Sequence, residues 1–136
     1  IKLVYQGVGM MEIRSFTKPK FRGKSYNKML RILMVILLAL LICEKYGIRD
    51  IYSQAINPIS AYVLMNNFKV IYNITGLRCG KRYFNNNKLE TRELVEKLYK
   101  KSDTVHIFVK LSKYNIKRAI ELLNIMLSDG IDAIKC

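Results

Sequence analysis

The sequence predicts an α/β or α+β fold, in which a mixed β-sheet is flanked by helices. Two observations carry this prediction. Segments rich in β-branched residues alternate with helix-like segments through about the first two thirds of the chain, as in a sheet covered by helices. The composition is 51% hydrophobic and 25% charged over 136 residues, which is enough apolar material for the core of one domain.

The chain opens with two short strand-like segments. Residues 1–5 read as the first strand, residues 6–9 as a turn, and residues 10–17 as a second strand in which apolar and polar side chains alternate. Pro19 ends this pattern, because proline has no N–H to donate to a sheet.

A long helix is predicted over residues 25–46, closed by Gly47 at a position that favours a left-handed backbone. Residues 32–43 of this helix form a run of twelve without a charge. A membrane span needs about 20 apolar residues, so we expect no span here. The run is apolar on all sides, so we expect it to be covered on all sides, by the sheet and by a second element or another protein chain.

Asn57 and Pro58 mark the start of the next helix, because Asn is a favoured N-cap and Pro is favoured at the first helical position. A strand over residues 48–56 precedes this helix, which runs to about residue 66. The later elements alternate between β-rich and helical patterns. They are a strand at 68–74, a basic loop at 77–88, a charged helix at 89–101, a strand at 104–111 and an amphipathic C-terminal helix at 115–128.

The net charge of +14 indicates an anionic partner, such as a phosphorylated cofactor, nucleic acid or an anionic membrane face. Between Glu12 and Glu44 there is no acidic residue, and the basic residues there crowd together. They are Arg14, Lys18, Lys20, Arg22, Lys24, Lys28 and Arg31. A nucleic-acid-binding module is possible but not favoured, since the sequence shows no zinc-finger or basic-zipper pattern and no clustered exposed aromatic residues for stacking.

The cysteines are three in number and widely spaced, at Cys43, Cys79 and Cys136. This spacing excludes a disulfide scaffold and lacks the paired ligands of a zinc site, so we expect no metal. It favours a reducing, intracellular (cytoplasmic) compartment.

A strand, a basic loop containing glycine and a helix start together suit phosphate binding, because the free N–H groups of a helix N-terminus attract anions. The loop has neither P-loop nor dinucleotide-binding spacing. The segment Phe16-Thr17-Lys18-Pro19-Lys20-Phe21-Arg22-Gly23-Lys24-Ser25-Tyr26-Asn27 instead resembles the acetyl-CoA-binding motif of the GNAT superfamily of N-acetyltransferases. Residues 57–69, from Asn57-Pro58 to Phe68-Lys69, resemble the second motif of that family.

The resemblance covers residues 10–75, the cofactor-binding core of a single GNAT-like domain that spans residues 1–136. It implies a mixed sheet splayed open between two strands, with acetyl-CoA in the gap as co-substrate. The backbone near Phe16, Thr17 and Lys18 would pair with the pantetheine arm, Asn57 would hold its end, and Tyr62 would protonate the thiolate leaving group. The pyrophosphate would lie on the amides of Arg22, Gly23, Lys24, Ser25, Tyr26 and Asn27.

The implied reaction is direct transfer of an acetyl group to an amine, carried by a protein or a small molecule. Ser25 and Asn27 depart from the family pattern, which has glycine at both positions. The family also places strands and helices before its acetyl-CoA motif, so we expect either that an upstream part is missing here or that the domain is trimmed at its N-terminus. These departures leave open a second function, an inactive GNAT-fold protein that acts through interactions. Glu12 and His106 are weaker candidates for a catalytic base in the implied reaction, Glu12 as a base for the acceptor amine.

Overall fold

A computed structural model describes residues 2–5, 10–14, 25–77, 80–84 and 87–128, and its side chains are described in residues 33–77, 80–84 and 87–125. The described chain is a mixed sheet flanked by helices, which confirms the predicted fold class. The elements are β1 (Lys2–Tyr5), β2 (Met10–Arg14), α1 (Ser25–Tyr46), β3 (Asp50–Ala55), α2 (Pro58–Asn67), β4 (Val70–Asn73), β5 (Lys81–Tyr83), α3 (Lys88–Tyr99), β6 (Val105–Lys110) and α4 (Lys113–Ser128).

The strands of the described chain form one six-stranded sheet in the order β1-β2-β3-β6-β4-β5. Strands β2 and β3 are parallel, and the other neighbouring pairs are antiparallel. The α1 helix lies in the connection between β2 and β3, as expected for adjacent parallel strands, which need a long crossover. The last strand in sequence, β6, lies in the middle of the sheet between β3 and β4.

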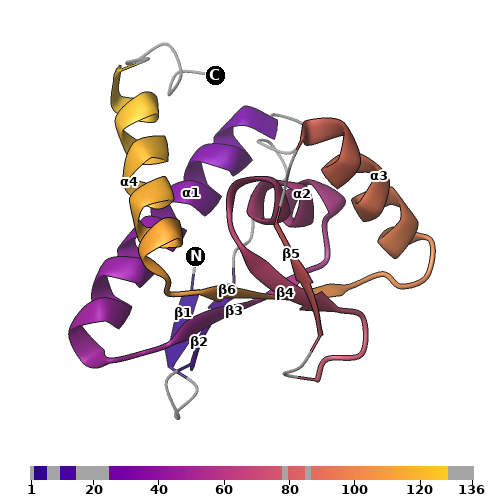
Figure 1. The fold of residues 1–136 in the computed structure, drawn as a ribbon, viewed down its shortest axis with the longest axis horizontal. Coiled ribbons are helices and arrows are strands. Elements are labelled where there is room, and N and C mark those ends of the chain that lie inside the picture. The colour runs from indigo at the N-terminus through magenta and orange to yellow at the C-terminus, as the bar shows by residue number, and fades with distance from the viewer. Residues whose placement is uncertain (1, 6–9, 15–24, 78–79, 85–86, 129–136) are drawn as a thin grey trace.

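The core lies between the sheet and the helices. Figure 1 shows the described helices gathered on one side of the sheet. Alternate residues of β6 face this layer, and Val105, Ile107 and Val109 are each at most 1% exposed. They belong to one buried cluster with Ile36 and Leu40 of α1. This cluster fixes which face of β3 and β6 looks toward the helices.

The predicted boundaries of α1 and α2 are confirmed. The α1 helix ends at Tyr46, and Gly47 follows with a φ of 69°, the left-handed conformation that glycine adopts without cost. Asn57 is the N-cap of α2, and its side-chain oxygen accepts a hydrogen bond from the backbone N–H of Ile59 at 2.8 Å.

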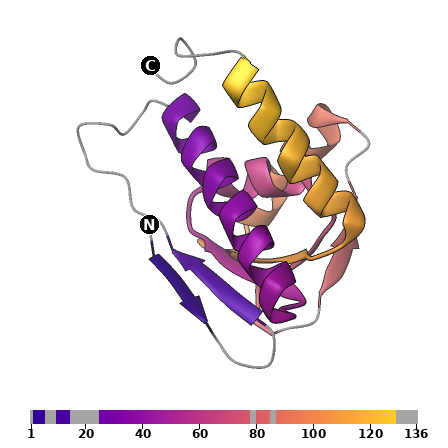
Figure 2. The same ribbon diagram turned by 90° about the vertical axis from the view of Figure 1, so that its left-hand side faces the viewer.

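The apolar surface of α1 is only partly covered by the rest of the described chain. Met34, Leu38 and Leu41 are 49%, 52% and 49% exposed. In Figure 2, α4 runs beside α1 in the opposite direction, so α4 and the sheet cover the remaining sides. No described element packs on this outer stripe, so the part of the expectation that concerns cover by another protein chain stays a prediction.

The predicted basic loop at 77–88 is wrong in its middle, where β5 pairs with β4 from Val70↔Tyr83 to Tyr72↔Lys81. The strand has only three residues, and Lys81 and Arg82 are exposed, so it carries no apolar alternation. Charged residues on a short edge strand are common, because they discourage pairing with another chain. Gly80 allows the close approach, since a Cβ there would clash with the carbonyl oxygen of Tyr72.

Candidate functional site

A cavity of about 140 Å³ lies where the carboxyl end of β3 meets the start of α2 and the middle of α1. In open sheets with parallel strands, ligands bind outside the carboxyl ends of those strands. The described residues that line the cavity come from α1, β3, the β3–α2 connection, α2 and β6. They are Val35, Ile36, Ile51, Ser53, Gln54, Ile56, Asn57, Ser60, Leu64 and Val109.

The hydrogen bonding of β3 leaves one edge open beside this cavity. The parallel pairing of β2 with β3 runs from Met10↔Asp50 to Ile13↔Ser53. On its other side, β3 pairs with β6 as far as Ala55↔Val105. Among the described residues, the pairing with β2 thus stops two residues before the end of β3, at the point where β3 lines the cavity.

The start of α2 is held in place from two directions. The Asn57 cap satisfies the N–H of Ile59, as described above. The hydroxyl of Tyr99, at the end of α3, donates a hydrogen bond to the carbonyl oxygen of Ala55. Burial raises the pKa of the Tyr99 phenol well above its ordinary value, so this hydroxyl stays protonated and keeps donating. The cavity mouth is therefore built on fixed backbone.

The cavity has an apolar interior and a polar rim. Val35, Ile36 and Leu64 are at most 5% exposed and line its inner part. Gln54, Asn57 and Ser60 supply an amide, a second amide and a hydroxyl. This combination suits a narrow, elongated ligand that carries amide groups. The apolar walls would bind the methylene groups of the ligand, and the polar groups of the rim would fix its orientation.

Most residues predicted to bind the cofactor lie outside the described part of the chain. Phe16, Thr17, Lys18, Arg22, Gly23 and Lys24 lie outside the described residues. Ser25, Tyr26 and Asn27 form the first turn of α1, but their side chains are not described. Of the predicted cofactor-binding residues with a described side chain, Asn57 lines the cavity.

Tyr62 lies on α2, half-buried, with the guanidinium carbon of Arg92 on α3 at 5.8 Å from its ring centre. It packs against the buried core cluster and is not among the described residues that line the cavity. Ser60, two positions earlier on α2, is the hydroxyl residue on the cavity side.

The structure gives His106, one of the weaker candidates for a base, a specific partner. Its Nδ1 lies 2.5 Å from the hydroxyl of Tyr52 on β3, and the two rings stack. Burial lowers the pKa of the imidazole below its ordinary value. Glu12 lies directly beside Tyr52 in the β2–β3 register, although its side chain is not described. The pair lies on the opposite face of the sheet from the helices, since Tyr52 and His106 alternate with inward-facing residues.

The statement that exposed aromatic residues do not cluster is wrong. Phe84, just after β5, and Tyr114, in the first turn of α4, are 48% and 41% exposed and pack edge to face at 5.2 Å. They stand 30 positions apart in the sequence (114 − 84), so only the pairing of β5 and the position of α4 bring them together. No local pattern could have revealed this contact.

No protein-family model, curated protein or solved structure matches the chain. Within the described ranges, no helix has both the length and the apolar character needed to cross a membrane. No three His, Cys, Asp or Glu residues come together as metal ligands in the described part of the chain.

Proposed function

We propose that the chain binds an acyl-CoA, with its acyl end in the cavity beside Asn57, and transfers the acyl group to an amine. The observation that carries the proposal is this cavity, apolar inside and rimmed by amides, at the open carboxyl end of β3. Residues 16–27, which resemble the acetyl-CoA-binding motif of the GNAT superfamily, follow β2 in the sequence, and the carboxyl end of β2 lies at the same end of the sheet as that of β3.

The distances along α1 suit an elongated ligand. Val35 and Ile36 line the cavity, and Ser25 begins the helix ten residues before Val35. At a rise of about 1.5 Å per residue, the N-terminus of α1 is about 15 Å from the cavity along the helix axis. A ligand with phosphates at one end and an acyl thioester at the other would reach both, because the helix N-terminus favours the anion.

In the proposed reaction, the amine nitrogen attacks the thioester carbonyl and the C–S bond breaks. The products are an amide and free CoA, with one proton lost from the amine and one gained by the sulfur. Backbone N–H groups near Thr17 would stabilise the oxyanion of the tetrahedral intermediate. The family resemblance implies Tyr62 as the proton donor, whereas Ser60 is the hydroxyl residue of α2 that lines the cavity.

A titration of acetyl-CoA into the purified chain by calorimetry tests the proposal. We expect saturable binding that is lost when Arg22 and Lys24 are both replaced by Ala. The matched control is Lys97→Ala/Lys101→Ala, which removes two exposed positive charges at and just beyond the end of α3. Absence of saturable binding at millimolar acetyl-CoA would refute the proposal. If both double variants bound acetyl-CoA equally weakly, the binding would be non-specific charge attraction, which would also contradict the proposal.

An amine-acceptor screen that follows release of the CoA thiol then separates the two functions left open by the sequence. Transfer to any amine supports the enzyme, and a Tyr62→Phe variant with a lower kcat but unchanged KM supports its role as proton donor. Saturable binding without transfer favours the inactive GNAT-fold protein.

The outer stripe of α1 supports a protein partner in either case. Met34, Leu38 and Leu41 recur at helical spacing and are each about half exposed. We propose that this stripe contacts another protein chain, either a different protein or a second copy of this chain. Sedimentation velocity tests self-association: we expect Leu38→Glu to leave a monomer where the unaltered chain forms a larger species.

A further inference from the structure

A cluster of aromatic and basic residues lies on the described surface around Phe84, away from the cavity beside Asn57. It combines Phe84 and Tyr114 with Lys69, whose ammonium lies 4.9 Å from the Phe84 ring centre and 4.6 Å from that of Tyr114. We name these three residues the aromatic cluster. The ammonium is held between the two rings by cation–π attraction, so it needs no further ordering to meet an anion.

The backbone of Lys69 is also fixed. The side chain of Asn115, fully buried, accepts a hydrogen bond from the Lys69 N–H at 2.8 Å and donates one to the Lys69 carbonyl at 2.9 Å. Lys69 and Tyr114 are therefore tied to the same turn of α4. The aromatic cluster is a preorganised surface, which lowers the entropy that a ligand must overcome.

Two hollows flank the ring of Phe84, and both use it as a wall. One, of about 290 Å³, is lined on its α4 side by Tyr114, Lys117, Arg118 and Glu121. The other, of about 410 Å³, is lined by Lys69, Arg82 and Lys110 among others. An extended ligand that passes over Phe84 would enter both hollows.

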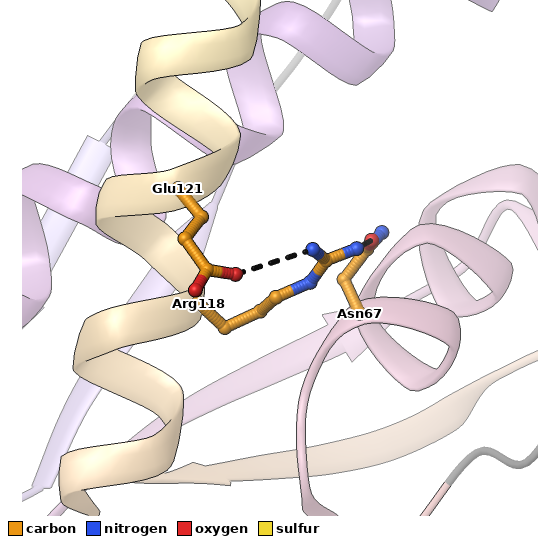
Figure 3. Close-up of polar contacts among 3 residues, drawn as sticks. All are labelled: Asn67, Arg118 and Glu121. Carbon is orange, nitrogen blue, oxygen red and sulfur yellow. Dashed lines mark hydrogen bonds and ion pairs between the residues drawn. The ribbon is translucent and has the colours of Figure 1, made fainter.

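Beside the cluster, Arg118 is paired with a carboxylate within the described chain, whereas Lys69, Arg82 and Lys117 are not. Figure 3 shows that Arg118 is already engaged, with Glu121 at 3.5 Å and the Asn67 side-chain oxygen at 3.3 Å. Among the described residues, no carboxylate forms an ion pair with Lys69, Arg82 or Lys117. These three cations can therefore pair with anionic groups of a ligand.

We propose that the aromatic cluster and its flanking cations bind single-stranded nucleic acid. Bases would stack on the exposed parts of the Phe84 and Tyr114 rings, and phosphates would pair with Lys69, Arg82 and Lys117. Aromatic rings beside a basic track are how proteins bind single strands without reading sequence. An acidic peptide would satisfy the cations but leave the ring faces unused. The net charge of +14 adds long-range attraction for the same partner.

The test is fluorescence anisotropy with a labelled oligouridine of about ten nucleotides, compared with an abasic strand of the same length. We expect Phe84→Leu and Tyr114→Leu each to weaken oligouridine binding about tenfold and to leave binding of the abasic strand unchanged. The matched control is Tyr46→Leu, which removes an exposed ring, 69% exposed, that also has a lysine, Lys45, over it at 5.7 Å. Equal affinity of wild type and Phe84→Leu for oligouridine would overturn the proposal.

The salt dependence tests the phosphate contacts. Replacing Lys117 with Gln should lower the slope of log affinity against log salt by about 0.7, the value for one contact to a single strand. Lys97→Gln, on α3, should leave the slope unchanged. An unchanged slope in Lys117→Gln would remove Lys117 from the site, and displacement of oligouridine by polyglutamate of equal charge would favour an acidic peptide instead.

Photocross-linking of unaltered protein to an oligomer that contains 4-thiouridine gives an independent test that needs no variant. Cross-links on peptides that contain Phe84 or Tyr114 support the proposal, and cross-links confined to residues 14–31 overturn it. The proposal does not depend on acyl-CoA binding. The Arg22→Ala/Lys24→Ala variant should lose acetyl-CoA and still show the tenfold effect of Phe84→Leu on oligouridine.

Discussion

The buried side chain of Asn115 connects α4 to the chain between α2 and β4 by bonding both backbone groups of Lys69. Its amide nitrogen also donates a hydrogen bond to the carbonyl of Lys110, at the end of β6, at 2.7 Å. One side chain therefore satisfies three backbone groups from two segments of the chain. This junction positions Tyr114 against Phe84 and orients Lys69 toward both rings.

Replacing Asn115 with Ala should lower the free energy of unfolding by about 2–4 kcal/mol, because buried backbone groups would lose their partners. Urea unfolding followed by circular dichroism measures this loss. Asn124→Ala, at an exposed position on the same helix, is the matched control and should change stability by less than about 0.5 kcal/mol. A similar small change in Asn115→Ala would contradict the role of the junction.

Asn57 has two proposed roles that two substitutions can separate. Asn57→Ala should destabilise the chain by about 1 kcal/mol through loss of the N-cap, whereas Asn57→Ser keeps a capping oxygen and should not. Both variants lose the side-chain amide on the cavity rim, so both should bind acetyl-CoA about tenfold more weakly. Calorimetry and urea unfolding give the two readouts. Normal acetyl-CoA affinity in Asn57→Ser would leave Asn57 as a cap alone.

Much of the fold could be predicted from the sequence, because local signals were strong. Gly47 and the Asn57-Pro58 pair marked the end of α1 and the start of α2, and the alternation of Val105, Ile107 and Val109 marked β6. β5 was missed, since its three residues are charged or half-exposed and its pairing depends on β4. The exposed stripe of α1 was also missed, because composition shows that a helix is apolar but not which side its neighbours cover.

The candidate sites also contain some features that local sequence signals predict and others that depend on tertiary contacts. Asn57 caps α2 as the sequence predicted, because the capping signal is local, whereas its predicted contact with the pantetheine arm stays a prediction. The aromatic cluster depends on contacts between residues 69, 84 and 114, so only the tertiary structure reveals it. The partnership of Tyr52 with His106 is likewise set by strand order, which places β6 beside β3.

Cys43 should be unreactive in the folded protein. Burial, with a smaller contribution from Asp50, raises its pKa from 9.0 to about 11, which lowers the thiolate fraction near pH 8 about 100-fold. Iodoacetamide labelling followed by peptide mass spectrometry should therefore show Cys43 unmodified in native buffer and modified in denaturant. Labelling of Cys43 at the same rate in both conditions would show that the core around α1 opens readily.

His106 should make stability depend on pH in the weakly acidic range. Burial holds its folded-state pKa below the ordinary value of 6.5, so the unfolded chain binds more protons than the folded chain as the pH falls below about 6.5. The stabilising contribution is thus present above that pH and is lost as the pH falls through the folded-state pKa. His106 is the single histidine of the sequence, and ordinary carboxyl groups titrate at about pH 4. Urea unfolding between about pH 5 and 7 should therefore show a decline that flattens in His106→Gln, and an unchanged decline in that variant would assign the pH dependence to another group.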